Sequence, residues 1–206
     1  QRQMCIRDST IHAMEVIPAD KVLRLAMLFH DMGKPVCRET DEWGIDHFHG
    51  HPQVSEEITG KVLRRLKFDN DTVYMVKKLV RCHDQYIPAD ERGVRRAMWR
   101  VGEDAFPLLL QVKKADMEAQ STFLIEEKEK NLQEVGRIYQ EILEKKQCVS
   151  LKTLAVNGRD LMDEAGYVPG KELGTILQEL LQLVIEEPEL NDKGTLLKEA
   201  RQRRNR

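Results

Sequence analysis

Residues 28–35 read LFHDMGKP, and they decide how the first part of the chain is interpreted. An apolar segment over residues 20–31 has helical spacing and runs into His30 and Asp31, after which Gly33 and Lys34 end it. An adjacent His and Asp at the end of a buried helix serve either as metal ligands or as a hydrogen-bonded polar pair. The rest of the sequence has to distinguish these two interpretations.

The spacing of apolar residues is helical along nearly the whole chain. Helices are predicted within residues 20–31, 55–68, 70–84, 103–120, 124–146, 150–166, 170–187 and 193–204. Asp20 is expected to cap the first of these, and Pro107 to lie in the first turn of the fourth, where a missing N–H costs little. Only residues 36–50 could hold a short hairpin, so the predicted fold class is all-α.

Composition and cysteine spacing exclude several classes of protein. With 206 residues, 41% hydrophobic and 33% charged, the chain is typical of a globular protein with a real core. No apolar run approaches the roughly 18 residues of a membrane span, and no secretory segment is visible. Cys5, Cys37, Cys82 and Cys148 are scattered without a CxxC pair, which favours reduced thiols in the cytoplasm over a disulfide framework or a zinc ribbon.

Charge is unevenly distributed along the chain. Residues 61–100 contain eleven Lys and Arg against five Asp and Glu, whereas residues 121–190 contain eight against fourteen. An anionic partner such as RNA would explain the basic stretch, in which Arg95 and Arg96 are candidate RNA contacts. The alternative is a solvated helix face that happens to be basic, and charge alone favours that alternative.

Five residues at the ends or on the faces of successive predicted helices could hold a divalent metal ion: His30, Asp31, His51, His83 and Asp116. Imidazoles and carboxylates are ligands that Mn, Fe, Ni, Zn and Mg accept, and a metal held there can activate water and polarise a phosphoryl oxygen. Lys34 could contact a substrate phosphate, so Asp31 and Lys34 are the candidate catalytic residues. Each residue alone is more typical of a structural role, and only the combination supports a metal site.

With the segments HFHGHPQVS (47–55), LVRCHD (79–84) and KKAD (113–116), this pattern resembles the HD superfamily of metal-dependent phosphohydrolases. The resemblance implies one or two divalent ions (Mg, Mn or Ni). It also implies the ligand order His, His-Asp, His, His, Asp, and the five residues match the last five of these ligands. His51 is expected just before a helix and is preferred because it stands four residues before Ser55. His47 and His49, in the same loop, are the alternatives.

Residues 30–70, 112–121, 147–162 and 174–201 resemble the C-terminal half of bacterial CCA-adding enzymes, the tRNA nucleotidyltransferases that build the terminal CCA. The segment LAVNGRDLM (154–162) is the most specific part of the resemblance. We expect an HD-type helical bundle over residues 10–120, a connecting helix over 121–146 and a small helical tRNA-binding tail over 147–206. The implied function is binding and positioning of tRNA. The alternatives are a stand-alone HD phosphohydrolase and a helical interaction module.

Two departures from this family pattern limit the expected activity. The family's β-sheet head with the nucleotide-transfer centre belongs upstream and has no counterpart here, so the chain is not expected to add nucleotides by itself. Ser9 stands where the first His ligand is expected, and His12 follows one helical turn later. Residues 1–9 show no apolar period and are expected to be foreign sequence or a sequencing scar.

The C-terminal part contains two predicted helix starts that are candidate RNA contacts. Asn157 or Gly158 could leave backbone N–H groups free for a phosphate, with Arg159 adding a charged contact, and Gly170 with Lys171 forms the second start. Ordinary capping is the alternative, and only the resemblance favours RNA. The basic end, residues 199–206, is expected to fray. Whether the chain forms a homodimer is not decided by the sequence.

Overall fold

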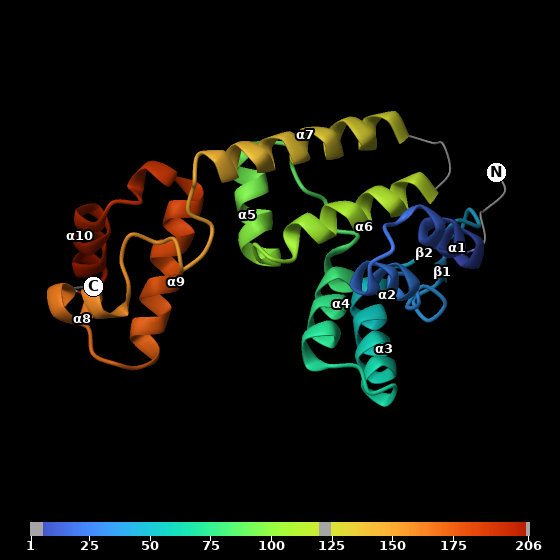
Figure 1. Cartoon of the computed structure of the whole chain (residues 1–206), viewed down its shortest axis with the longest axis horizontal. Helices are drawn as coiled ribbons and strands as arrows, with labels where there is room; N and C mark the ends of the chain where they lie inside the picture. The colour runs from blue at the N-terminus through green and yellow to red at the C-terminus, as the bar shows by residue number, and fades with distance from the viewer. Residues whose placement is uncertain (1–5, 120–124, 205–206) are drawn as a thin grey trace. The chain divides into compact units, whose positions relative to one another are not determined.

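The computed structural model describes residues 6–119 and 125–204, which form ten α-helices, one short 3₁₀-helix and a two-stranded hairpin (Figure 1). The predicted all-α class is therefore confirmed. The chain divides into two compact units: residues 1–86 with 104–133 form the first unit, and residues 87–103 with 134–206 form the second. Residues 87–103 thus group with the C-terminal region, although they lie inside the range expected for the first domain. Residues 1–5, part of the segment expected to be foreign, lie outside the described residues.

The first unit is built from five helices and the beginning of a sixth. They are α1 (Ile6–Val16), α2 (Lys21–Phe29), α3 (His51–Arg65), α4 (Asn70–Cys82), α6 (Phe106–Ala119) and the start of α7 (Ile125–Glu144). Helix α1 had no counterpart among the helices predicted from sequence. Asp20 caps α2 through hydrogen bonds from the N–H groups of Val22 and Leu23, and Pro107 is the second residue of α6, as predicted.

The core of the first unit places the HD dipeptide. Helix α4 packs against α2 and α3, while α1 packs against α6 and α2. Met27, Leu63, Leu79 and Phe106 are fully buried between these helices. Each such side chain stabilises the fold by about 1.5–3 kcal/mol. Because α2 buries its apolar face here, the residue that follows it, His30, is carried into the interior.

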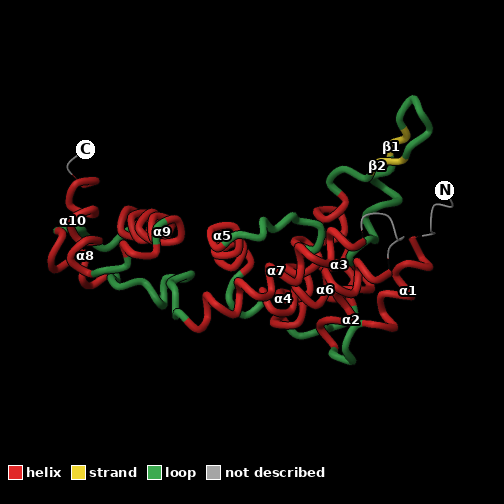
Figure 2. The backbone as a smooth tube through the Cα atoms, turned by 90° about the horizontal axis from the view of Figure 1, so that it is seen from above, coloured by secondary structure: helices red, strands yellow, loops and turns green. Residues whose placement is uncertain are grey.

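The predicted hairpin is confirmed and leads into α3. Strands β1 (Glu39–Thr40) and β2 (Asp46–His47) pair antiparallel, and Figure 2 shows the hairpin projecting from the helices of the first unit. Helix α3 begins at His51, not at Ser55 as the sequence predicted. Gly50, with φ of +77°, is its N-cap, and Pro52 lies in its first turn. His51 is therefore the first residue of α3, and the start of this helix fixes its backbone.

The second unit contains α5 (Glu91–Val101), the end of α7, α8 (Gly158–Ala165), α9 (Lys171–Glu186), the 3₁₀-helix η1 (Pro188–Leu190) and α10 (Lys193–Arg204). Helices α8, α9 and α10 close around one apolar cluster, which includes Leu161, Leu180, Leu181 and Leu196. The apolar stripe of α9 is core, as its helical spacing predicted.

The basic end of α10 is ordered where the structure describes it. Arg201 donates through Nε and Nη2 to the backbone carbonyl of Glu164, at 2.9 and 2.7 Å, and Arg204 donates to that of Ala165 at 3.2 Å. These carbonyls end α8 and need donors because the helix provides none for them. The expectation of fraying is therefore wrong for residues 199–204, while residues 205–206 lie outside the described residues.

Candidate metal centre and nucleic-acid contacts

Three buried imidazoles in the first unit are fixed in the same way. In each, Nδ1 lies within hydrogen-bond distance of the backbone carbonyl three residues earlier: His30 to Met27 at 2.6 Å, His51 to Phe48 at 2.9 Å, and His83 to Val80 at 2.7 Å. A carbonyl oxygen only accepts, so each Nδ1 carries a proton and donates it. In the neutral ring the lone pair is then on Nε2, which is the tautomer that a metal ligand requires.

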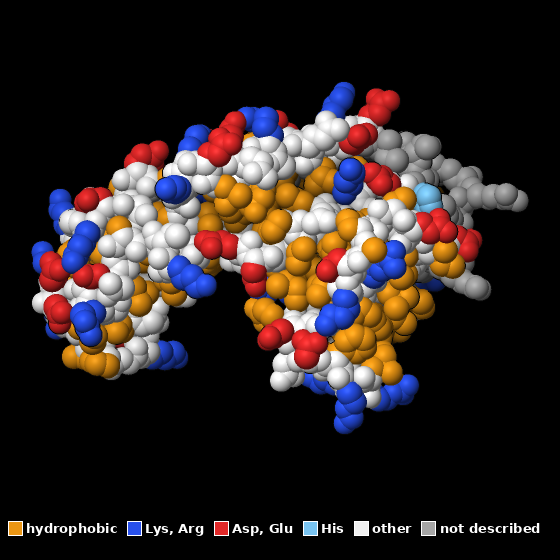
Figure 3. Space-filling model, in the orientation of Figure 1, with side chains coloured by type: hydrophobic (Ala, Val, Ile, Leu, Met, Phe, Trp, Pro, Cys, Tyr) orange, Lys and Arg blue, Asp and Glu red, His pale blue; other side chains and the backbone are white. Residues whose placement is uncertain are grey.

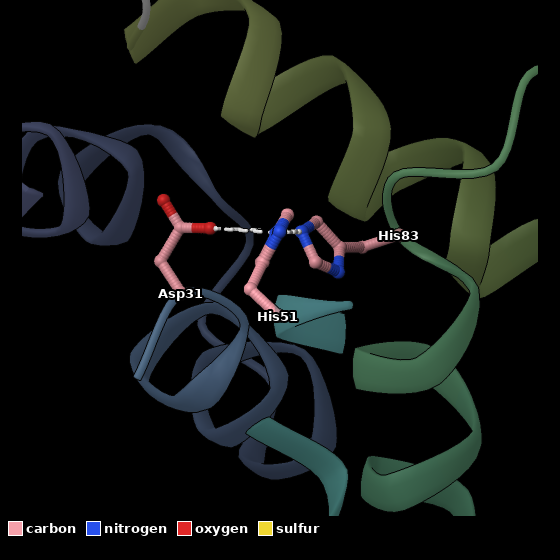
Figure 4. Close-up of side chains that lie close together, drawn as sticks. All are labelled: Asp31, His51 and His83. Atoms are coloured by element: carbon pink, nitrogen blue, oxygen red, sulfur yellow. Dashed lines mark hydrogen bonds and ion pairs between the residues drawn. The ribbon is translucent and has the colours of Figure 1, made fainter. Parts of the chain in front are cut away.

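The Nε2 atoms converge on the carboxylate of Asp31 (Figure 4). Nε2 of His51 lies 3.3 Å from Nε2 of His83 and 3.4 Å from Oδ1 of Asp31, and Nε2 of His83 lies 3.7 Å from the same oxygen. All three side chains are buried, and one ligand atom from each lies within 4.8 Å of the others. Lone pairs that face one another at these distances repel unless a proton or a cation lies between them.

One buried oxygen atom of this cluster lacks a hydrogen bond. Oδ1 of Asp31 is buried and has no hydrogen-bond partner within the part of the chain that the structure describes. A buried carboxylate oxygen in this state is costly unless a positive charge compensates it. Two imidazole nitrogens and a carboxylate oxygen are ligands for Mn, Ni, Fe or Zn, so the residues fit a divalent ion.

His30 and Asp116 form the other side of the cluster. Nε2 of His30 lies 3.3 Å from Oδ2 of Asp31 and 3.3 Å from Oδ1 of Asp116. Burial disfavours the imidazolium, but the hydrogen bonds to Asp116 and Asp31 outweigh it and raise the pKa of His30 to about 10. Burial likewise opposes ionisation of the two carboxyls, yet His30 keeps both of their pKa values below the ordinary range. All five residues predicted as ligands therefore lie together.

Two lysines adjoin the cluster. Nζ of Lys34 lies 2.5 Å from Oδ2 of Asp31, so the two residues predicted as catalytic are in direct contact. Nζ of Lys113 donates to the backbone carbonyl of His83 at 2.7 Å, and burial lowers its pKa. Sequence reasoning did not single out Lys113, although it lies one helical turn before Asp116 and begins the KKAD segment.

A close approach at Gly33 joins the end of α2 to the start of α3. The N–H of Gly33 donates to Oγ of Ser55 at 2.8 Å. A Cβ at position 33 would lie 2.5 Å from the carbonyl oxygen of His51 and 2.8 Å from the backbone nitrogen of Ser55. Only glycine fits, and Ser55 ties the helix that begins with His51 to the HD segment.

The other histidines lie apart from the cluster. His47 and His49 stack on each other with ring centroids 5.6 Å apart, and His47 pairs with Asp41 at 2.9 Å. His12, weighed as a substitute for the missing first ligand, has a side chain 54% exposed and pairs with Glu15 at 3.5 Å. Ser9 lies with it in α1. The structure therefore brings His51, rather than its loop neighbours, to Asp31.

Arg95, one of the predicted RNA contacts, is only 4% exposed. Its guanidinium donates to the backbone carbonyls of Ile185 at 2.8 Å and Glu186 at 3.4 Å, and to the side chains of Glu91 at 3.3 Å and Gln147 at 3.2 Å. These bonds join α5 to the end of α9 and to Gln147, three residues after the end of α7. Arg95 therefore has a structural role in the second unit.

Arg96 is half exposed but paired. Its Nε and Nη2 donate to the carboxylate of Glu186 at 2.5 and 2.8 Å, and Arg92 donates to the same carboxylate. The hydrogen bond from Arg96 is the main reason that the pKa of Glu186 is lowered. An RNA phosphate at Arg96 would have to compete with this ion pair.

The two predicted helix starts differ from each other. Oδ1 of Asn157 accepts from the N–H groups of Arg159 at 2.9 Å and Asp160 at 3.2 Å, while Asp160 accepts from the N–H of Asn157 at 2.9 Å. The expectation that these N–H groups are free is wrong, because this capping box uses them. Gly158 begins α8, and the side chain of Arg159 is exposed.

At the second helix start, Gly170 has φ of +156° and precedes α9 without a side-chain cap. Lys171, the first residue of α9, is exposed. The side chains of Arg159 and Lys171 therefore remain open to solvent in the second unit. No helix within residues 6–119 and 125–204 is both long and apolar enough to cross a membrane.

These features define a helical protein with a buried His–Asp cluster that is suited to a divalent metal. The family model described as "tRNA nucleotidyltransferase domain 2 putative" matches residues 39–200, and the chain belongs to this family. The match includes His51, His83 and Asp116, whereas His30 and Asp31 lie before it.

Three relatives have related names. The chain is 32% identical to the A-adding tRNA nucleotidyltransferase of Deinococcus radiodurans, over 80% of this chain and 38% of the relative. It is 35% identical to the CC-adding tRNA nucleotidyltransferase of Thermus thermophilus, over 77% of this chain and 35% of the relative. It is 31% identical to the CCA-adding enzyme of Limosilactobacillus reuteri, over 70% of this chain and 32% of the relative. The chain therefore spans about a third of the length of these relatives. No solved structure gives a significant match.

Proposed function

We propose that this chain is the tRNA-binding body and tail of a tRNA nucleotidyltransferase that completes the CCA end. The family match over residues 39–200 carries this proposal. The three relatives are named for adding A, CC and CCA, yet each is similar to this chain over 70–80% of the chain's length. A region common to enzymes that add different nucleotides fits a role in holding their common substrate rather than in choosing the nucleotide.

Binding of tRNA is tested by fluorescence anisotropy with labelled tRNA that lacks its CCA end. We expect binding that weakens steeply between 50 and 200 mM salt, because phosphate contacts release counterions, by about 10³-fold if roughly six phosphates are neutralised. The affinity should not change with EDTA, and the chain alone should not incorporate CMP or AMP. Absence of binding at 50 mM salt, or nucleotide incorporation by the purified chain, would contradict the proposal.

The buried cluster supports a second candidate function, metal-dependent hydrolysis of phosphate esters by an HD-type centre. The unpartnered Oδ1 of Asp31 and the inward Nε2 atoms favour it. His30, Asp31, His51, His83 and Asp116 would hold one or two divalent ions (Mg, Mn or Ni). A bound ion would lower the pKa of its water and polarise a phosphoryl oxygen. Lys34, at the cluster edge, would bind a substrate phosphate through its ammonium group.

Hydrolysis is tested with phosphomonoesters and cyclic phosphodiesters in the presence of Mn or Ni. We expect turnover that Asp31→Ala abolishes, since this substitution removes the carboxylate at the centre of the cluster. Asp163→Ala, which removes an exposed carboxylate of α8, is the matched control and should keep full activity. Equal turnover of wild type and Asp31→Ala would exclude this centre as the source of the activity.

We also propose a cytoplasmic location, which the free thiols of Cys37, Cys82 and Cys148 and a tRNA substrate both favour. A homodimer stays a prediction. Light scattering of the purified chain, measured at several concentrations, would test it.

A further inference from the structure

The basic stretch over residues 61–100 separates into two groups with different surroundings. In the second unit, Arg92 and Arg96 pair with Glu186 and Arg95 is buried. In the first unit, α3 and α4 carry Lys61, Arg64, Arg65, Lys77, Lys78 and Arg81. The second group keeps most of its charge uncompensated, so it is the better candidate for an anionic ligand.

The ion pairs of the second group are few. Lys77 and Arg81 share one carboxylate, that of Glu56, at 3.2 and 3.8 Å. Lys61, Arg64 and Arg65 have no ion pair with any residue that the structure describes. The dipole of α3 favours the two arginines in its last turn, but it does not account for the cations on α4.

The cations of the two helices form one surface. On α3, Lys61, Arg64 and Arg65 are spaced i, i+3 and i+4, and therefore share a face. A Cβ at Gly60 would lie 3.2 Å from Cδ of Lys77 and 3.9 Å from Nη1 of Arg64. The side chain of Lys77 thus crosses α3 at Gly60, beside Arg64, and joins the two helix faces.

The α4 side of this surface also presents an aromatic ring. Tyr74, Lys77, Lys78 and Arg81 are spaced i, i+3, i+4 and i+7 on α4. Tyr74 is 58% exposed, and Nζ of Lys78 lies 4.6 Å from the centroid of its ring. An exposed aromatic ring held beside a cation is a typical feature of surfaces that stack on nucleobases.

We call the six cations together with Tyr74 the α3–α4 basic face. Six cations against the carboxylates of Glu56, Glu57 and Asp71 on the same two helices leave a formal charge of +3. Figure 3 shows Lys and Arg side chains gathered at the end of the first unit where α3 meets α4. Asp69, at this end, is paired with Lys21 at 3.3 Å and so adds little opposing charge.

We propose that the α3–α4 basic face binds RNA, with its cations on the phosphodiester backbone and Tyr74 stacked on an unpaired base. This inference rests on the proposed function and assigns the RNA contact within the basic stretch to α3 and α4 of the first unit rather than to Arg95 and Arg96. RNA supplies both the negative charge and the π-face that this surface complements, whereas an acidic protein segment supplies only the charge.

The test uses the full chain and two variants of equal net charge. The face variant is Lys61→Gln/Arg64→Gln/Lys78→Gln. The control variant is Arg24→Gln/Lys114→Gln/Lys130→Gln, which removes three exposed cations elsewhere in the first unit. For the face variant, we expect the slope of log K against log salt to fall by about two to three, since each lost phosphate contact removes roughly 0.7–0.9. The control should change it by less than about one.

Tyr74→Leu tests the stacking contact. It should lower tRNA affinity by at least about fivefold and leave the salt slope unchanged. Thermal unfolding should show both triple variants and Tyr74→Leu folded, because changes of this kind at exposed or partly exposed positions alter stability little.

The outcomes separate this inference from the proposed function. A face variant that behaves as the control does, while the wild type binds tRNA, would refute the basic face and leave tRNA binding intact. Binding of a polyglutamate peptide with the same affinity as tRNA would replace RNA by an acidic protein as the ligand. A wild-type chain that binds no tRNA would remove both proposals.

Discussion

The two units each bury a charged side chain, and they treat it in opposite ways. Asp31 in the first unit and Arg95 in the second are both 4% exposed. Arg95 donates to four acceptors, two backbone carbonyls and two side chains. Asp31 instead keeps one oxygen without a hydrogen bond and directs it at two imidazole nitrogens. Burial of a charge alone therefore does not mark a functional site, whereas unsatisfied groups that converge do.

The largest expected effect is on Arg95, because its network holds the second unit together. Arg95→Met should lower the free energy of unfolding by about 3 kcal/mol, since it leaves the carbonyls of Ile185 and Glu186 without a donor. Urea unfolding measures the loss. Hydrogen exchange should then rise in residues 87–103 and 134–204 and stay unchanged in the cluster around Asp31. A variant as stable as wild type would show that the network is dispensable.

Metal should stabilise the first unit and leave the second unaffected. Mn or Ni at about 100 times its dissociation constant should stabilise the native state by about 2.7 kcal/mol, because the ligands converge only when the chain is folded. Thermal unfolding with and without the ion gives the shift, and isothermal titration gives the affinity. Asp31→Ala should lose both signals, while Arg95→Met should keep the titration. A shift of equal size in Asp31→Ala would contradict a site at the cluster.

Gly33→Ala should weaken the cluster without touching a ligand. Its new Cβ would meet backbone atoms of His51 and Ser55, so α3 has to move, at a cost of about 1–3 kcal/mol. We expect weaker Mn or Ni binding together with a lower melting temperature. Gly136→Ala in α7 is the control, since a Cβ there meets nothing within 4 Å. It should be neutral or stabilising, by up to about 1 kcal/mol.

Asn157 distinguishes capping from RNA contact in the second unit. Asn157→Ala removes the cap of α8 and should cost about 1 kcal/mol, with little change in the salt dependence of tRNA binding. Arg159→Ala should show the reverse pattern, with unchanged stability and a smaller salt slope. Thermal unfolding and anisotropy measure the two quantities. Loss of tRNA affinity in Asn157→Ala at full stability would make Asn157 a direct contact.

The smallest expected effect is the pH dependence of the Glu186 pair. The hydrogen bond from Arg96 holds the pKa of Glu186 below its ordinary value of 4.5 in the folded chain. The folded state therefore binds fewer protons than the unfolded state, and the stabilisation is present above pH 4.5 and is lost as the pH falls below it. At pH 6 the wild type should have a higher melting temperature than Glu186→Gln, and this difference in melting temperature should disappear in acid. A difference in melting temperature that grows on acidification would contradict the lowered pKa of Glu186.

The sequence by itself determined the elements. Helical spacing and local caps, such as Asp20 before α2, depend on neighbours a few residues away, and so they are readable without the fold. The same holds for the HD dipeptide and the spacing that suggested a metal. Helices α1 and α5 and the start of α3 at His51 were missed. The start of α3 has a glycine N-cap in place of a capping side chain, so no strong local pattern marks it.

Only the tertiary structure decided which of these residues are available for function. It brought His51 rather than His47 or His49 to Asp31, buried Arg95, and left Lys61, Arg64 and Arg65 of α3 exposed. Residue type gives a side chain's charge and its ligand atoms. Whether those atoms are satisfied depends on partners 20 to 90 positions away in the chain, such as Ser55 for Gly33 and Ile185 for Arg95. Such partners meet only when the helices pack, and that packing separates a structural charge from a functional one.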